Sequence, residues 1–402
     1  MIPFSPPRMD EKIVEEVKKA LLSGWITTGP RTKKLEQQLS SYTGADKCLC
    51  LSSGSAGLEL ILRWFGVKDG DEVIVPAYTY AATANVVMHC GAKVVFVDVN
   101  EKDFNISVEA IEKAITKNTK VIMAVDLGGF PADYKEIHEA IESKKHLFKA
   151  NGPTQKKLGR PLLLSDAAHS IGAEYHGKKT GSLTDITVFS FHAVKNLTTA
   201  EGGALCLKLP ASFDVEEIYK DLNRKSLHGQ SKDALAKTQK GNWRYDILEA
   251  GYKYNMTDLQ AAIGLVELER YEEDMLPRRK RIFEQYSQAF AKHNWAILPE
   301  YKNKTKTSSY HLYLLRIKGI TEAQRDQIIE GIFAKDVSVN VHYIPLPMMT
   351  FYKEEGYRME DYPQTYLNYC CEITLPVYYN LNDEMVQEVI NAVVTSVEEV
   401  MG

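Results

Sequence analysis

One aspartate and one lysine stand out because each follows an apolar run that is typical of a buried strand. Asp166 comes directly after Pro161–Ser165, which contains three consecutive leucines. A carboxylate at such a position costs free energy unless cations or hydrogen-bond donors surround it. Lys195 lies in the turn after Ile186–Phe191, and a lysine held among apolar neighbours can lose its proton and act as the nucleophile of a Schiff base. A structural cap for Asp166 and a solvated surface position for Lys195 are the alternatives.

Two further segments follow predicted strands. The loop Leu51–Gly57 is rich in serine, glycine and alanine, and small residues ahead of a helix let backbone N–H groups approach an anion. It lacks the G-K-[ST] ending of a Walker-type loop, and a plain tight turn is the alternative. Tyr80 follows the run Glu72–Val75, where an aromatic ring could stack on a planar cofactor or serve only for packing.

Together these four places predict a pyridoxal phosphate site. That cofactor requires a lysine for its aldehyde, a carboxylate for its pyridine nitrogen and a cradle for its phosphate, and an aromatic ring often covers it. The residues occur along the chain in the order cradle, aromatic, aspartate, lysine. Doubly wound sheets bind ligands beyond the carboxyl ends of their strands, so we expect the four places to meet there.

The elements around these residues predict an α/β fold. Helical segments alternate with short, continuous apolar runs, which indicates a mostly parallel sheet with helices on both faces. The predicted strands are Lys47–Leu51, Glu72–Val75, Lys93–Val97, Lys120–Val125, Pro161–Ser165 and Ile186–Phe191. The predicted early helices are Leu58–Phe65 and Asp10–Leu22, the latter with Ile13, Val14, Val17 and Leu21 on one face.

The last third of the chain predicts a smaller α+β domain. Thr257-Asp258-Leu259-Gln260 forms a capping box ahead of an apolar helix. Short β-like pieces are expected at Tyr310–Ile317 and Val337–His342. The C-terminal helix should bury Val386, Val389, Ile390, Val393, Val394 and Val397. We therefore divide the chain into a large cofactor-binding domain, residues 1–252, and a small C-terminal domain, residues 253–402.

Composition excludes several classes of protein. The 402 residues are 44% hydrophobic and 25% charged, which is incompatible with a disordered or low-complexity chain. The net charge of -4 gives no support to a basic nucleic-acid binder, and the basic runs Arg278–Arg281 and Ser143–Pro161 are interpreted as solvated surface.

Signals for export, membrane insertion and metal binding are also missing from the sequence. No signal-peptide pattern and no run of about 18 apolar residues is found. We therefore expect a cytoplasmic protein that does not bind membranes. With no C-x-x-C motif or histidine pair to complete a zinc site, the six cysteines are predicted to be reduced thiols, and no metal is expected.

Five motifs carry a resemblance to a known family. They are Ser23–Pro30, Asp166–His169, Ser190–Asn196, Glu201–Gly203 and Gly251–Asp258. From Phe4 to its final helix, the chain resembles the DegT/DnrJ/StrS family of fold-type I, pyridoxal-phosphate-dependent aminotransferases, which act on nucleotide-linked keto sugars. The first and last motifs are most similar to those of enzymes that aminate UDP-linked 4-keto sugars, of the UDP-4-amino-4-deoxy-L-arabinose type.

The resemblance implies roles around the cofactor ring. Lys195 would carry the cofactor as a Schiff base and later shuttle a proton, and Asp166 would pair with the pyridinium nitrogen. Tyr80 would stack on the ring, and His169 would contact its phenolic oxygen.

Other residues would hold the cofactor's phosphate. The resemblance assigns this task to Ser55, Ala56 and Ser190. Asn255 matches an asparagine that reaches the phosphate of the neighbouring subunit's cofactor. That role implies a homodimer with shared active sites.

The implied reaction moves an amino group from glutamate to the C4 ketone of a nucleotide-linked, specifically UDP-linked, sugar for aminosugar and polysaccharide biosynthesis. Lys195 favours transamination because similar sugar dehydratases carry histidine at that place. A dehydratase, an aromatic-amine synthase or a non-catalytic regulator on the same fold is the alternative.

The substrate itself is less well defined by the resemblance. Thr27, Thr28 and His342 would contact it. Asp126–Gly129 and Pro347 depart from the pattern of many relatives at places where sugar contacts would lie. The resemblance therefore does not define which sugar is aminated.

Overall fold

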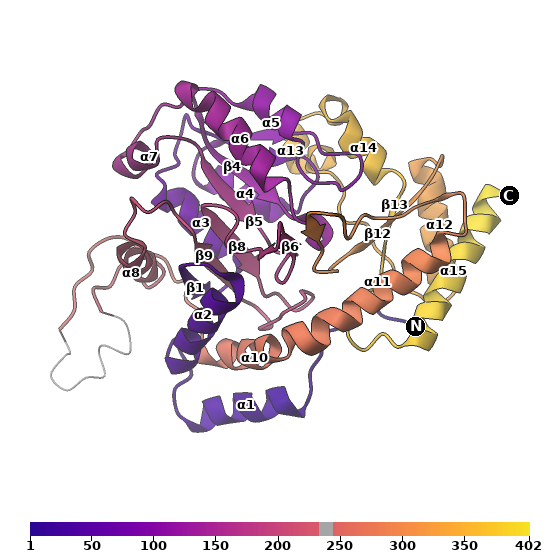
Figure 1. Cartoon of the computed structure of the whole chain (residues 1–402), viewed down its shortest axis with the longest axis horizontal. Coiled ribbons are helices and arrows are strands. Elements are labelled where there is room, and N and C mark those ends of the chain that lie inside the picture. Colours follow the sequence, from indigo (N-terminus) through magenta and orange to yellow (C-terminus); the bar gives the residue numbers. More distant parts are fainter. Residues whose placement is uncertain (233–243) are drawn as a thin grey trace.

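The computed structural model describes residues 1–232 and 244–402. At its centre lies a seven-stranded sheet in the order β1-β9-β8-β5-β4-β2-β3 (Figure 1). Its strands are β1 Lys47–Leu51, β2 Glu72–Pro76, β3 Lys93–Val97, β4 Thr119–Val125, β5 Leu162–Asp166, β8 Ile186–Ser190 and β9 Gly203–Leu207. The six strands predicted from apolar runs are therefore confirmed, within one residue at each end.

The sheet is mostly parallel, as predicted. Strand β2 pairs in parallel with β3 and β4, β4 with β5, and β5 with β8. Strand β9 is antiparallel to both β8 and β1. Ser190 at the end of β8 lies opposite Gly203 at the start of β9, so the connection that carries Lys195 turns back at the carboxyl edge of β8. Such a hairpin-like return pairs its two strands antiparallel.

Helices cover both faces of this sheet, because side chains alternate along each strand. Val73 packs with α3, α4 and α8 on one face, and its neighbour Ile74 packs with α5 and α6 on the other. Helices α2 and α10 cover the second face beside β1 and β9. The bounds are α1 Glu11–Leu22, α2 Pro30–Thr43, α3 Gly54–Trp64, α4 Ala81–His89, α5 Val108–Ala114, α6 Tyr134–Lys144, α7 Pro153–Leu158, α8 Val215–Lys225 and α10 Asp258–Glu269.

The C-terminal part builds a second core around a three-stranded antiparallel sheet, β10-β12-β13. Its strands are β10 Ala296–Ile297, β12 Tyr313–Ile317 and β13 Glu372–Leu375, and its helices are α11 Leu276–Phe290, α12 Glu322–Ala334, α13 Thr350–Glu354, α14 Pro363–Tyr369 and α15 Asp383–Met401. A π-helical turn, Tyr271–Met275, joins α10 to α11, and β6 Glu174–Tyr175, β7 Lys178–Lys179 and β11 Lys306–Thr307 form a small third sheet.

Two expectations for this part have different outcomes. The buried stripe of α15 is confirmed for all its predicted members except Val394, which is only partly buried. Of the two expected β-like pieces, Tyr310–Ile317 contains the strand β12. Val337–His342 forms only single bridges, Val337 with Ile2 and Asn340 with Thr374, and no continuous strand. The division between residues 252 and 253 stays a prediction, and α10 packs against α1 and α2.

Within the described ranges, no helix has both the length and the apolar character needed to cross a bilayer.

Helix α1 lies at the periphery, below the sheet in Figure 1, where it packs on α10. Ile13 is buried as predicted, but Val14 and Leu21 are each 54% exposed. The stripe is therefore only partly covered, because a single helix rather than the sheet lies beneath it. Leu22 and Ile26 extend the exposed apolar surface, which is typical of a surface that binds a partner.

The interpretation of Ser143–Pro161 as solvated surface is wrong for its second half. Gln155 on α7 is fully buried, and its side-chain amide donates to the carbonyl of Phe65. Asn151 donates to Asp71 Oδ1 over 2.5 Å. Arg160 forms two 2.7 Å bonds with the carboxylate of Asp185, which is 3% exposed. Through these hydrogen bonds and this ion pair, the segment packs against the sheet domain.

The basic run Arg278–Arg281 is likewise not all at the surface. Arg279 is 4% exposed, and its guanidinium donates to the carbonyls of Tyr310 and His311. Arg278 pairs with Asp383 at the start of α15. The cations of this run therefore join α11 to neighbouring parts of the chain.

The Arg160–Asp185 pair gives a stability prediction. Arg160→Met should lower the free energy of unfolding by about 3–5 kcal/mol, because Asp185 would remain buried without its cation. Urea unfolding followed by circular dichroism measures the change. Lys145→Met in the same segment is the matched control, since its exposed pair with Glu142 should contribute at most about 1 kcal/mol. Equal effects of both substitutions would contradict the assignment.

Candidate active site

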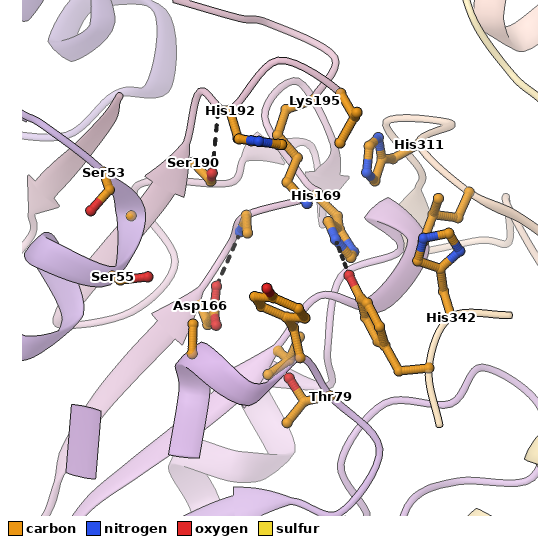
Figure 2. Close-up of a pocket in the computed structure, with 18 of the residues that line it drawn as sticks. Ser53, Ser55, Thr79, Asp166, His169, Ser190, His192, Lys195, His311 and His342 are labelled. Atoms are coloured by element: carbon orange, nitrogen blue, oxygen red, sulfur yellow. Dashed lines mark hydrogen bonds between the residues drawn. The ribbon is translucent and has the colours of Figure 1, made fainter. Parts of the chain in front are cut away.

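A cavity of about 340 Å³ lies at the carboxyl edge of β5 and β8 (Figure 2). It is bordered by the start of α3, the turn after β8 and two segments of the C-terminal part. Of the residues predicted for the site, those that line it are Ser55, Tyr80, Asp166, His169, Ser190, Lys195 and His342. Ala56, Thr27, Thr28 and Asn255 are not among the lining residues. The strand-end argument thus brings most of the predicted residues together.

Asp166 is the last residue of β5 and is 8% exposed. Thr83 Oγ1 donates to its Oδ2 over 2.8 Å, and the backbone N–H of Ala168 donates to its Oδ1 over 3.3 Å. Burial raises the pKa of Asp166, while these donors and the charge of Lys195 lower it. Among the described residues, no cation forms an ion pair with this carboxylate, so it can pair with a cationic group in the cavity.

Thr83 was missed by the sequence analysis, although it holds Asp166 in place. Because Thr83 donates to Asp166, the 2.8 Å contact between Thr79 and Thr83 has Thr79 as its donor. Both threonines are buried. The signal was weak but present: Thr83 lies three residues after Tyr80, in the first turn of the helix that follows β2.

Lys195 lies between β8 and β9 and lines the cavity across from Asp166 (Figure 2). Its backbone N–H donates to the carbonyl of His192 over 2.9 Å, which closes a tight turn. Loss of hydration lowers the pKa of Lys195 to about 8, although the charge of Asp166 favours the protonated form. Because Lys195 lines the cavity and is partly buried, the alternative of a fully solvated surface lysine is not supported.

The phosphate cradle predicted from the loop is the first turn of α3. The helix begins at Gly54, four residues before the predicted start, and Ser53 caps it by accepting the N–H of Ala56 over 3.0 Å. The N–H groups of Gly54 and Ser55 precede the first intrahelical bond and remain available to an anion. The N–H of Ala56 is already engaged by the cap, and Ala56 does not line the cavity.

Close packing requires glycine beside this cradle. A Cβ at Gly54 would come within 3.2 Å of the Ser190 side chain, and one at Gly203 would come within 2.5 Å of the Gly54 nitrogen. The helix start and the end of β8 therefore approach each other closely enough for Ser55 and Ser190 to line one corner of the cavity.

Tyr80 stands at the mouth of the cavity and is 62% exposed. Its ring centroid lies 5.7 Å from that of Tyr343. An aromatic ring this exposed contributes little to a core, so the packing alternative is not supported. A planar ligand could instead cover its face.

His169 is buried beside two residues that the sequence analysis missed, Tyr343 and His311. Its Nε2 lies 3.0 Å from the Tyr343 hydroxyl, and its ring centroid lies 4.4 Å from that of His311. Burial and the charge of Lys195 hold the pKa of His169 well below its usual range, so the ring is neutral. Both neighbours come from the C-terminal part, which no pattern within a single element could place beside β5.

The turn Asp126–Gly129 lies behind His169, and none of its residues lines the cavity. The backbone N–H of Gly128 donates to His169 Nδ1 over 3.3 Å. The expectation that this departure from the family pattern lies among sugar contacts is not supported within a single chain. His342 does line the cavity, where its Nδ1 contacts Thr374 Oγ1 at 3.1 Å.

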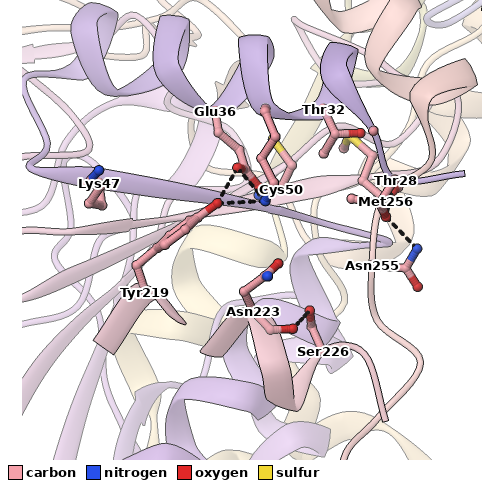
Figure 3. Close-up of polar contacts among 12 residues, drawn as sticks. Thr28, Thr32, Glu36, Lys47, Cys50, Tyr219, Asn223, Ser226, Asn255 and Met256 are labelled. Atoms are coloured by element: carbon pink, nitrogen blue, oxygen red, sulfur yellow. Dashed lines mark hydrogen bonds and ion pairs between the residues drawn. The ribbon is translucent and has the colours of Figure 1, made fainter. Parts of the chain in front are cut away.

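Asn255 and Thr28 form a separate polar contact near the start of α10 (Figure 3). Asn255 Nδ2 donates to Thr28 Oγ1 over 2.7 Å, and Thr28 Oγ1 donates to the carbonyl of Met256 over 2.6 Å. The buried Oδ1 of Asn255 has no hydrogen-bond partner in the described part of the chain. Thr27 is exposed, and its carbonyl accepts the N–H of Asp258.

The donor set fits pyridoxal phosphate. Four features surround one cavity: an amine of lowered pKa, a buried carboxylate that forms no ion pair with the described residues, a helix start with available N–H groups and an exposed aromatic ring. These are the groups that the aldehyde, ring nitrogen, phosphate and ring face of that cofactor require.

Comparisons with known proteins agree with this fit. An uncharacterized protein of Methanocaldococcus jannaschii is 40% identical over 404 residues, covering 99% of this chain and 98% of that protein. The spore coat polysaccharide biosynthesis protein SpsC of Bacillus subtilis is 34% identical over 398 residues, covering 98% and 96%. Spr1654 of Streptococcus pneumoniae, named as a sugar aminotransferase, superimposes in its pyridoxamine phosphate form with a TM-score of 0.96 at 46% identity over 100% of both chains.

The solved structures of Spr1654 also include a pyridoxal phosphate form, with a TM-score of 0.95 and 45% identity over 100% of both chains. Residues 7–394 of the present sequence match the DegT/DnrJ/EryC1/StrS aminotransferase family. The chain therefore belongs to the DegT/DnrJ/EryC1/StrS aminotransferases, whose cofactor is pyridoxal phosphate.

Proposed function

We propose that this protein transfers an amino group from glutamate to the C4 ketone of a nucleotide-linked, specifically UDP-linked, keto sugar. The observation that carries the proposal is the placement of Lys195 and Asp166 across one cavity, with an anion-binding helix start beside them. The names of SpsC and Spr1654 support a sugar as the acceptor and polysaccharide synthesis as the context. We place this reaction in the cytoplasm.

When bound, pyridoxal phosphate supplies an electron sink and an aldehyde carbon that accepts and releases the amino group. Asp166 Oδ atoms would hold a proton on the ring nitrogen, and Thr83 would keep that carboxylate oriented. Lys195 Nζ would hold the cofactor, then take the proton from the α-carbon of the amino donor. In the second half-reaction the same nitrogen would deliver a proton to C4 of the sugar.

Residues around this pair would bind and orient. The N–H groups at the start of α3, with the hydroxyls of Ser55 and Ser190, would hold the phosphate. Tyr80 would cover the ring face and limit access of water. His342 would contact the substrate from the C-terminal part.

The lowered pKa of Lys195 predicts how the apoprotein takes up its cofactor. Covalent uptake requires the neutral amine, so its rate should rise with pH up to about 8 and then level off. An ordinary lysine would continue to gain reactivity up to about pH 10. Stopped-flow absorbance at a series of pH values measures this rate, with Lys195→Ala as the blank. A rate that still increases steeply above pH 9 would contradict the assignment.

Asn255 supports a homodimer with shared active sites. It lies outside the cavity of its own chain, and its Nδ2 donates one hydrogen to Thr28 and has a second that a phosphate can accept. Helix α1, which packs on α10 just after Asn255, carries exposed apolar side chains on its outer face. We infer that Asn255 serves the phosphate site of the partner subunit.

A mixing experiment tests that inference. Lys195→Ala and Asn255→Ala should each be strongly impaired alone, whereas a mixture should recover activity, because a mixed dimer contains one intact composite site. At random exchange of equal amounts, half of the dimers are mixed and each has one good site, so about a quarter of the wild-type activity is the upper limit. No recovery despite exchange proven by native mass spectrometry would rule out a shared site.

The overall function is tested by supplying glutamate and UDP-, dTDP- or GDP-linked 4-keto sugars to the purified protein. The expected result is one amino sugar formed for each 2-oxoglutarate, with the UDP-linked substrate preferred. A dehydrated sugar without glutamate consumption would favour the dehydratase alternative. No amino product from any of the three nucleotides would reject the proposal.

A further inference from the structure

The two ring nitrogens of His169 have distinct hydrogen-bonding roles. The backbone N–H of Gly128 points at Nδ1 over 3.3 Å. A backbone N–H can only donate, so Nδ1 must be the nitrogen without a proton. Because the ring is neutral, its one proton is on Nε2. The 3.0 Å contact between Nε2 and the Tyr343 hydroxyl is therefore a bond that His169 donates and Tyr343 accepts (dashed in Figure 2).

This assignment determines which hydrogen bonds the Tyr343 hydroxyl can still form. Its oxygen accepts from His169, so its own hydrogen must point elsewhere. This hydroxyl donates no hydrogen bond to the described residues, and Tyr343 lines the cavity beside Tyr80. Burial and the charge of Asp166 raise the pKa of Tyr343, so the hydroxyl keeps its proton. The cavity wall thus offers an oriented O–H donor next to His169.

The chemistry of pyridoxal phosphate indicates which atom meets this donor. On its ring, the phenolic oxygen and the phosphate-bearing carbon lie on opposite sides of the line from the ring nitrogen to the aldehyde carbon. Asp166 and Lys195 define that line in the cavity. Ser53, Ser55 and Ser190 lie on one side of it in Figure 2, and His169, His311 and His342 lie on the other. The phenolic oxygen therefore belongs on the side of His169 and Tyr343.

We propose that Tyr343 donates the hydrogen bond to the phenolic oxygen of the cofactor and that His169 acts as a positioning residue for Tyr343. This inference rests on the proposed function, and it changes the role that the resemblance implied for His169. The His169 Nε2–H is committed to Tyr343 in this arrangement. The turn at Gly128 contributes by selecting the tautomer.

Tyr343→Phe tests the donor directly. The variant keeps the ring but loses the hydroxyl, so the negative charge on the phenolic oxygen is less stabilised. The pH at which the absorbance of the bound cofactor changes should rise by about one to two units, as expected for loss of a hydrogen bond to a charged group. Tyr352→Phe is the matched control: its hydroxyl donates to Asn85 over 2.6 Å outside the cavity, and its spectral titration should match the wild type.

Variants at position 169 distinguish positioning from direct contact. His169→Leu should shift the titration in the wild-type background but add nothing in Tyr343→Phe. His169→Gln should restore most of the wild-type value, because a Gln amide can accept from Gly128 and donate to Tyr343. An unchanged titration in Tyr343→Phe, or an equal effect of His169→Leu in both backgrounds, would overturn the inference.

The wild-type protein distinguishes failure of the proposed function from failure of the role of Tyr343. Wild-type protein that shows no bound-cofactor band would overturn the proposed function together with the inference. A normal wild-type band and normal amino transfer, combined with an unshifted Tyr343→Phe, would overturn only the role of Tyr343.

Discussion

Lys195→Ala is expected to lower amino transfer by at least about a thousandfold and to remove the absorbance band of the covalently held cofactor. The loss has two causes, because the same nitrogen anchors the cofactor and moves the proton, and proton transfer alone contributes about 10² to 10⁴ in rate. Lys195 lines the cavity with Asp166, and loss of hydration lowers its pKa to about 8. Steady-state kinetics and absorbance spectra of the same preparation measure both effects.

The control for this experiment is a lysine with no role in the cavity. Lys208→Ala removes an exposed pair with Asp46 and should leave spectrum and turnover unchanged. External methylamine is expected to restore part of the proton transfer in Lys195→Ala but not the covalent anchor. Wild-type turnover in Lys195→Ala would exclude the proposed mechanism, whereas equal losses in both variants would indicate a general defect.

The positions of Asp166 and Lys195 could be predicted from sequence because each follows a buried strand of the same sheet. Continuous apolar runs located β5 and β8 within one residue, and parallel strands place their carboxyl ends at one edge. The small residues at the start of α3 and the aromatic after β2 followed from the same rule. The chemistry at the sheet edge is therefore encoded locally, in short segments whose patterns are strong.

The opposite wall of the cavity could not be predicted in this way. His311 and Tyr343 belong to irregular segments of the C-terminal part, and their approach to His169 depends on packing between distant parts of the chain. β-like pieces were expected around both residues, but each lies outside a regular strand, so no strand period fixes the direction of its side chain. The backbone N–H of Gly128 donates to His169 Nδ1 and so selects the tautomer of the ring. Because every residue except proline has such an N–H, the residue types cannot predict this contact.

Burial of polar residues was the other failure, and it has a physical cause. Gln155, Arg160 and Arg279 occur in polar segments and were expected at the surface, yet each is buried with hydrogen-bond partners. The residue types in a segment indicate the free-energy cost of burying their polar groups. They do not indicate whether the fold supplies hydrogen-bond partners that offset this cost. Those partners, such as the carbonyl of Phe65 and the carboxylate of Asp185, lie far away in sequence.

Asp166→Ala should lower kcat/KM by at least about a hundredfold, the loss expected for a positioned electrostatic group, and should weaken cofactor binding. Without the carboxylate, the ring nitrogen loses its proton and withdraws fewer electrons from the reacting carbon. Asp166→Asn keeps the shape of the side chain but removes its charge. The amide oxygen can still accept from Thr83, although the NH2 group cannot replace the oxygen that accepts from Ala168. The neutral side chain cannot stabilise a cationic ring nitrogen. Both variants are compared by single-turnover kinetics with glutamate and by titration with pyridoxal phosphate.

Two comparisons decide whether the loss arises from the charge or from the structure around it. Thr83→Val removes one donor but keeps the carboxylate, so its effect should be about tenfold, at the low end of the range for one hydrogen bond to a charged group. A cofactor analogue methylated on its ring nitrogen has a permanent positive charge, so it should restore part of the rate in Asp166→Ala. If the analogue gave no recovery although it bound, Asp166 would act through the architecture of the β5 edge rather than through the ring nitrogen. If Asp166→Asn kept wild-type turnover, the carboxylate would have no electrostatic role, and the assignment of this strand end to the pyridine nitrogen would fail.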